Sequence, residues 1–217
     1  DRNGLARNTL IIFTSDNGPW LNFGNHAGTT GGLREGKGTS WEGGQRVPCI
    51  MRWTGVIPAG EICNRLASSI DLLPTVAAIT GASLPEKKID GVNILPLMLG
   101  DESITPRHEF LYYYRGNSLE AVQRDHWKLV LPHTSYQSYR YMKPGKDGWP
   151  GPYGTETIYT NELYDLRRDP GEWYDVASQF PEKVKELEEL ARKARLDLGD
   201  DITGDRGAYR RQPGSVK

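Results

Sequence analysis

The sequence predicts an α/β protein in which an α/β layer structure is followed by a small antiparallel sheet with a C-terminal helix. Three observations predict this class. An apolar run at residues 10–14 ends in a polar turn, and apolar residues recur at helical spacing over residues 69–80. From residue 108 onward, short segments alternate apolar and polar residues, and a second helical repeat follows at residues 182–198.

The N-terminal elements follow from these patterns. Residues 10–14 show no polar alternation, which is typical of a strand of a parallel sheet that is covered on both faces. Residues 24–44 contain eight glycines and therefore predict a loop that allows close approach of the backbone. Residues 46–53 predict the next strand. Residues 69–80 predict a helix, because a serine or aspartate can cap its start and Gly81 can end it.

The C-terminal segments predict an antiparallel meander with one helix. Residues 132–155 are rich in Gly, Pro, Tyr and Trp and predict a long loop. Residues 182–198 predict a helix, since Pro181 stands at its start and Gly199 just beyond its end. The predicted strands are residues 110–114, 126–131 and 161–166. The expected parts of the chain are the α/β layer structure at 1–107, the antiparallel subdomain at 108–199 and a polar, solvated tail at 200–217.

Charge and hydropathy exclude several classes of function. The 217 residues include 27 Lys and Arg against 28 Asp and Glu, so no net positive charge favours nucleic acid or an anionic membrane. No apolar stretch reaches the length of about 18 residues that a membrane span needs, and the first residues lack the pattern of a signal peptide. We therefore expect neither a nucleic-acid nor a membrane partner.

The two cysteines do not predict a metal site. Cys49 and Cys63 have no partner Cys or His at zinc spacing, and two cysteines do not make a disulfide framework. Free cysteines are among the most buried residue types. We expect two buried thiols, with a single bridge as the open alternative.

Asp16 and Asn17 directly follow the first strand and allow two interpretations. Asp-Asn-Gly is one of the best turn sequences. Carboxylate and amide oxygens at a strand end are also the donors that a hard cation such as Ca²⁺ prefers. The residues alone leave both interpretations open.

Three further side chains of the glycine-rich loop are candidates for substrate binding. Lys37 is an ammonium held among glycines, which suits a sulfate or phosphate oxygen, although the spacing is not that of a P-loop. His26 could donate to a substrate oxygen. Arg34 could line the pocket or pair with Glu35. The alternative for each is a structural or solvated charge. Farther along the loop, Glu42 and Arg46 predict a buried ion pair.

Four segments together resemble the sulfatase family, of the arylsulfatase A-like type. They occur in order over about residues 8–198: IIFTSDNGPW, GGLREGKGTSWEGGQRVPCIMRWTGVIPAG, LASSIDLLPTVAAITGA and ELYDLRRDPGEWYDVA. The block GKGTSWEGG followed by Arg-Val-Pro is highly specific for these enzymes, and LYDLRRDPGE is a second marker. The resemblance implies an alkaline-phosphatase-like α/β fold, with residues 1–107 as the C-terminal part of the catalytic domain and residues 108–199 as its C-terminal subdomain.

The resemblance also implies an activity and roles for residues. It implies calcium-dependent hydrolysis of a sulfate ester, on an aryl or carbohydrate substrate, by a formylglycine made from a cysteine. Asp16 and Asn17 inherit two calcium ligands, and Asp16 also helps to deprotonate the nucleophile. Lys37 inherits sulfate binding, and His26 is interpreted as facing the substrate. Arg34 is kept beside them as a candidate for substrate binding. The expected partner is a sulfated small molecule or glycan, and the expected location of the intact enzyme is the periplasm or the exterior.

One departure from the family pattern is large. The modified cysteine of the family lies in a Cys-x-Pro/Ala-x-Arg motif, and neither Cys49 nor Cys63 fits it. We therefore expect that the nucleophile and the other metal ligands belong to an N-terminal half, and that this chain alone is inactive and holds calcium weakly or not at all. Two alternatives stay open: a phosphonate or phosphate-ester hydrolase of the same superfamily, and a non-catalytic module that binds a sulfated glycan.

Overall fold

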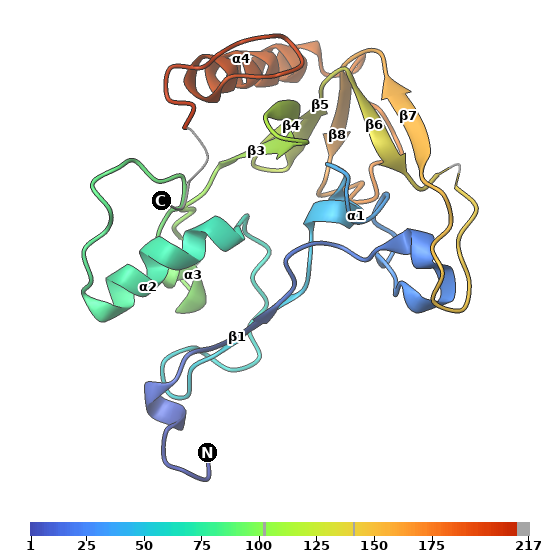
Figure 1. The fold of residues 1–217 in the computed structure, drawn as a ribbon. Helices are drawn as coiled ribbons and strands as arrows, with labels where there is room; N and C mark the ends of the chain where they lie inside the picture. The colour runs from blue at the N-terminus through green and yellow to red at the C-terminus, as the bar shows by residue number, and fades with distance from the viewer. Residues whose placement is uncertain (102, 141, 212–217) are drawn as a thin grey trace, which may run out of the picture. The chain divides into compact units, whose positions relative to one another are not determined.

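The computed structural model (Figure 1) describes residues 1–101, 103–140 and 142–211, apart from the side chains of Tyr136 and Gln137. The chain divides into two compact units. The first comprises Asp1–Asp16 and Pro48–His108, and the second comprises Asn17–Val47 and Glu109–Lys217. The glycine-rich loop thus belongs in space with the C-terminal sheet, although it lies between two strands of the first unit in the sequence.

The first unit contains a two-stranded antiparallel sheet. β1 (Ile11–Thr14) pairs with β2 (Cys49–Arg52), and Ile12 lies opposite Met51. The prediction of a parallel strand covered on both faces is therefore wrong for the described residues, and the Phe13 side chain is 67% exposed. An apolar run shows that a strand suits apolar surroundings. Whether the strand runs parallel or antiparallel to its partner depends on how the chain connects the two strands.

Both cysteines are exposed free thiols, so the prediction of buried thiols is wrong and the alternative of a bridge is not realised. Cys49 belongs to β2, three of whose four residues are exposed. The preference of cysteine for the interior is a statistical tendency that a particular exposed strand overrides.

The helix predicted over residues 69–80 forms in the first unit. A 3₁₀ turn (Ser69–Asp71) continues as α2 (Leu72–Thr80), which ends where Gly81 adopts a left-handed conformation with φ of 72°. The Asp71 side chain accepts from the backbone N–H of Ser68 in a capping box and pairs with Arg107. The described part of this unit also contains a 3₁₀ turn (Ala6–Asn8) and the single turn α3 (Leu95–Met98).

The second unit is built on a four-stranded antiparallel sheet with the order β3-β4-β5-β8, which confirms the predicted meander. Its strands are β3 (Glu109–Tyr114), β4 (Ser118–Arg124), β5 (Trp127–Val130) and β8 (Glu162–Asp165). β6 (His133–Ser138) and β7 (Gly154–Ile158) form a separate antiparallel ribbon. The prediction of a continuous loop over residues 132–155 is therefore wrong at both ends, because cross-strand pairing orders segments whose composition is typical of loops.

The four-stranded sheet has apolar residues on both faces. α4 (Pro181–Leu198) packs on one face, where its buried residues meet Leu119, Leu129 and Leu163 (Figure 1). On the other face, the indole of Trp41, from the glycine-rich loop, is 2% exposed and packs in one cluster with Val130 and other apolar residues of the sheet. The packing of Trp41 therefore fixes the glycine-rich loop, which carries Lys37 and Arg34, on the face of the sheet opposite α4.

The chain after α4 folds back on that helix. The Asp200 side chain is buried and accepts from the Leu119 N–H and from Arg195. The N–H groups of Ala208 and Tyr209 donate to the last turns of α4. Residues 212–217 of the predicted tail lie outside the described residues. None of the helices in the described ranges has the length and apolarity needed to cross a membrane.

Candidate functional site

Asp16 and Asn17 lie just after β1, where the two units meet in the sequence. Asp16 is exposed and Asn17 is half-buried. The Asn17 side-chain amide donates to the Gly18 carbonyl at 2.9 Å. A Cβ atom on Gly18 would lie 1.8 Å from the Gly43 carbonyl oxygen, so only glycine fits this turn against α1 (Glu42–Gln45).

The donor chemistry of this pair suits calcium, but the number of donors does not complete a site. A carboxylate and an amide oxygen are hard ligands of the kind that Ca²⁺ binds. Over the described ranges, no group of three or more His, Cys, Asp or Glu side chains is placed to hold a metal ion. Asp16 and Asn17 can therefore supply only a part of the six or more oxygens that the ion needs.

Lys37 is half-buried on a loop whose backbone is fixed from two sides. Its N–H donates to the Pro19 carbonyl at 2.9 Å, and its carbonyl accepts from the Tyr139 hydroxyl at 2.5 Å. The ammonium nitrogen lies 5.2 Å from the centre of the Trp20 ring. The hydrogen bonds that hold the loop use the backbone of Lys37 and not its ammonium group.

His26 ends a 3₁₀ segment (Leu21–His26) and is exposed. This segment is tied to the long loop after β6, because the N–H groups of Gly145 and Gly151 both donate to the Asn22 carbonyl, at 2.8 Å and 2.7 Å. The structure thus brings together two loops that the sequence separates by more than a hundred residues.

Arg34 is buried, and protein groups surround its guanidinium. The group stacks on the Trp41 ring at 3.4 Å from its centre and forms an ion pair with Glu156 at 3.2 Å. It also donates to the Tyr164 hydroxyl and to the Glu172 carbonyl. These contacts give Arg34 a structural task, and its contact with substrate stays a prediction.

Glu35 does not pair with Arg34 but ties the loop to β6. Its carboxylate accepts from the Ser138 hydroxyl at 3.1 Å and from the Tyr139 N–H at 2.5 Å. Burial raises the pKa of Glu35 above its ordinary value, although these hydrogen bonds oppose the rise. The backbone of Glu35 has φ of 59°, an uncommon conformation for a residue with a side chain.

A buried ionic cluster anchors the loop. The sequence predicted only the ion pair of Glu42 with Arg46, which lies at the exposed side of this cluster. The Lys128 ammonium is fully buried and lies 2.8 Å from Glu172 Oε1 and 3.2 Å from Glu42 Oε1. It also donates to the Ser40 carbonyl at 2.7 Å. The predicted pair of Glu42 with Arg46 forms at 2.9 Å, but half of the Arg46 side chain is exposed, so the buried partner of Glu42 is Lys128.

This cluster joins the two most distinctive sequence blocks. Glu42 belongs to GKGTSWEGG and Glu172 to LYDLRRDPGE, and the Glu42 N–H donates directly to Glu172 Oε2 at 2.7 Å. Lys128 alternates with Leu129 along β5, so the period of two places it on the face opposite α4. That alternation could have indicated on which face of the sheet Lys128 lies. Nothing in the sequence shows which segment covers that face.

Comparisons with known proteins match both parts of the chain. The family model described as Sulfatase matches residues 1–82, and the model described as the C-terminal region of aryl-sulfatase matches residues 106–206. Arylsulfatase A of Homo sapiens is 39% identical over 208 residues, an alignment that covers 89% of this chain and 39% of that protein. N-acetylgalactosamine-6-sulfatase of Canis lupus familiaris is 35% identical over 196 residues and covers 86% of this chain and 37% of that protein.

Solved structures are similar as well. The PsFucS1 sulfatase from Pseudoalteromonas sp. matches with a TM-score of 0.74 and 27% identity, over 88% of this chain and 38% of that chain. Ps i-CgsB, in a complex with k-i-k-neocarrahexaose, matches with a TM-score of 0.66 and 27% identity, over 88% of this chain and 37% of that chain. The chain thus spans about two fifths of the length of these relatives.

Proposed function

Because the chain belongs to the sulfatase family, of the arylsulfatase-like type, we propose that it takes part in the hydrolysis of a sulfate ester. The observation that carries this proposal is Lys37. It lies in the block GKGTSWEGG, and the fold holds its backbone between Pro19 and Tyr139 while its side chain stays half-buried beside Trp20. A fixed ammonium in a partly desolvated place is suited to a sulfate oxygen.

The residues of this chain would act as follows. The Lys37 ammonium binds the sulfate group and neutralises charge that develops on its oxygens. Asp16 and Asn17 hold a calcium ion, which supplies further neutralisation when it is bound. The Asp16 carboxylate would also be the acceptor for a proton from the nucleophilic hydroxyl, which a formylglycine in the upstream part of the enzyme would supply. His26 and Arg34 line the substrate side, with His26 as the exposed donor.

The substrate class we propose is an aryl sulfate or a sulfated carbohydrate. The similar proteins are named for aryl, steryl and N-acetylgalactosamine 6-sulfate substrates, so the names themselves do not choose between the two. We also propose that the intact enzyme is exported to the periplasm or the exterior, where sulfated glycans are met. Cell fractionation tests this, and a purely cytoplasmic pool would contradict it.

The proposal is tested by reading the gene upstream of the codon for Asp1. A Cys-x-Pro/Ala-x-Arg motif in that sequence supports formylglycine-dependent sulfate ester hydrolysis. A Ser or Thr in place of the cysteine favours a phosphonate or phosphate-ester hydrolase. Upstream sequence without the motif and without further aspartate ligands favours a module that only binds sulfated glycans.

The purified 217-residue chain is expected to show no turnover of 4-nitrophenyl sulfate. Neither of its cysteines lies in the family motif from which the formylglycine is made. Release of 4-nitrophenolate, followed by absorbance, measures the activity. Turnover above the rate of the Lys37→Ala variant would contradict the expectation, because it would require a nucleophile within this chain.

Calcium binding by the same chain is expected to be weak or absent. Asp16 and Asn17 supply two donor residues for an ion that takes six or more oxygens. Isothermal titration calorimetry with CaCl₂ measures the affinity, and Asp16→Asn is the matched variant. A dissociation constant in the micromolar range that Asp16→Asn abolishes would show that this chain completes the cage, contrary to the expectation.

A further inference from the structure

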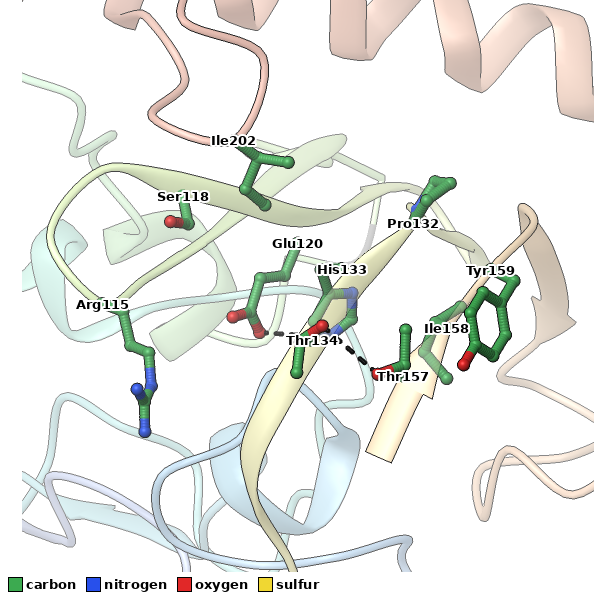
Figure 2. A pocket seen from close by; sticks show the side chains of 10 residues that line it. All are labelled: Arg115, Ser118, Glu120, Pro132, His133, Thr134, Thr157, Ile158, Tyr159 and Ile202. Carbon is green, nitrogen blue, oxygen red and sulfur yellow. Dashed lines mark hydrogen bonds and ion pairs between the residues drawn. The ribbon is translucent and has the colours of Figure 1, made fainter. Parts of the chain in front are cut away.

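A cavity of about 440 Å³ opens in the second unit, on the segments that join the sheet to the β6–β7 ribbon (Figure 2). This volume lies in the range of small-molecule sites. The walls come from the start of β4, from β6 and β7, and from the chain beyond α4. The lining residues are Arg115, Ser118, Glu120, Pro132, His133, Thr134, Thr157, Ile158, Tyr159 and Ile202.

Glu120 places a carboxylate oxygen at the base of this cavity. The residue is 3% exposed. Its Oε2 atom accepts a hydrogen bond from the Ser40 hydroxyl and lies 3.4 Å from His133 Nε2. Among the residues that the structure describes, none bonds to Oε1, and this atom is not sealed from the cavity. A carboxylate oxygen that opens onto a cavity can accept a hydrogen bond from a donor group of a bound ligand.

His133 fixes the orientation of that carboxylate. The ring is buried, and its Nδ1 lies 2.7 Å from the Leu131 carbonyl oxygen, which can only accept. Nδ1 therefore carries a proton. The Nε2 side of the ring lies against the Glu120 carboxylate, as the dashed line in Figure 2 marks. The acceptor at the base is set in place before any ligand arrives.

The remaining walls carry hydroxyl groups and apolar surface. Thr134 and Thr157 face each other with 3.3 Å between their hydroxyl oxygens, and Ser118 adds a third hydroxyl. Ile158 is among the apolar residues of the walls. Tyr159, which also lines the cavity, is 83% exposed, so its ring can stack on a ligand.

We propose that this cavity binds a pyranose ring, with a sugar hydroxyl donating to Glu120 Oε1. Hydroxyl groups both donate and accept, which matches a wall of hydroxyls beside a carboxylate. The C–H faces of the ring match the apolar walls and the exposed Tyr159 ring. The guanidinium of Arg115 in the same lining disfavours a ligand ammonium as the donor. The site needs no sulfate on the sugar, so it goes beyond the proposed hydrolysis at Lys37.

The test uses neutral methyl pyranosides and the full 217-residue chain. Saturation-transfer NMR with the gluco, galacto, manno and fuco glycosides is expected to show saturable binding of at least one of them. Glu120→Gln keeps the shape but loses the charged acceptor, and we expect it to weaken that binding about tenfold or more. Tyr159→Ala changes an exposed side chain, leaves folding intact and is expected to weaken binding about threefold or more. Tyr174→Ala, at an exposed tyrosine outside the cavity, is the matched control and should bind like the wild type.

Three outcomes would overturn the proposal. The first is that none of the four glycosides binds the folded wild-type chain. The second is binding that both Glu120→Gln and Tyr159→Ala leave unchanged. The third is binding of sulfated sugars alone that Lys37→Ala abolishes, which would support the proposed function while it assigns recognition to the other site.

Discussion

Replacing Lys128 with methionine is expected to lower the free energy of unfolding by about 3–5 kcal/mol. Methionine fills a similar volume, but the carboxylates of Glu42 and Glu172 lose the cation that lies 3.2 Å and 2.8 Å from them. Both carboxylates are buried, so water cannot replace that cation. Urea unfolding followed by circular dichroism measures the change.

The size of this loss should depend on pH. Burial raises the pKa of Glu172 to about 6 even with Lys128 present, and removal of the cation raises that pKa further. A carboxyl whose folded pKa exceeds its unfolded pKa costs stability as the pH rises through the folded value, because the unfolded chain ionises more readily. The destabilisation by Lys128→Met should therefore be larger at pH 8 than at pH 5.

Two further variants make the result decisive. Lys185→Met removes an exposed lysine of α4 that pairs with Glu182 at 3.0 Å, and it should cost less than about 1 kcal/mol. Adding Glu172→Gln to Lys128→Met should recover part of the lost stability, since it removes one uncompensated charge. If Lys128→Met costs no more than Lys185→Met at pH 8, the ionic cluster does not anchor the loop.

Replacing Lys37 with alanine is expected to lower kcat/KM for a sulfate ester by about 10²–10³-fold, in protein expressed with its upstream coding sequence. The loop should keep its shape, because the hydrogen bonds to Pro19 and from Tyr139 involve the backbone of Lys37, which the substitution leaves in place. The loss then reports the missing charge on the sulfate group. Initial rates with 4-nitrophenyl sulfate measure it.

The matched control is Lys146→Ala, at a loop lysine whose side chain is 82% exposed. This variant should keep the wild-type rate. Lys37→Arg keeps the charge and should retain more activity than Lys37→Ala, although the planar guanidinium changes the geometry. A rate for Lys37→Ala within about threefold of the wild type would show that sulfate binding does not depend on this residue.

The fold class was predictable from local patterns, and the similar solved structures confirm the alkaline-phosphatase-like sulfatase fold. The helix over residues 69–80 and the helix ending at Leu198 needed only apolar spacing and terminal residues. The ribbon of β6 and β7 was missed because its residues are polar and its order comes from pairing. The direction of β1 was missed for a related reason, since a strand does not encode the path of the chain to its partner.

The candidate site likewise contains residues that the sequence identified and residues that it did not. Asp16, Asn17 and Lys37 were identifiable because their blocks are short and contiguous in the sequence, and their catalytic roles stay predictions. Lys128 was not identifiable, because its neighbours Trp127 and Leu129 only mark it as a residue on one face of a strand.

The sequence by itself therefore determined the family, the helices and the positions of the candidate residues, all of which rest on short-range patterns. The tertiary structure alone decided the antiparallel direction of β1, the burial of Lys128 between Glu42 and Glu172, and the cavity onto which Glu120 opens. The physical reason is that a repeat along the chain shows which residues share a face. What covers that face is fixed by segments far away in the sequence, such as the glycine-rich loop that packs on the sheet through Trp41.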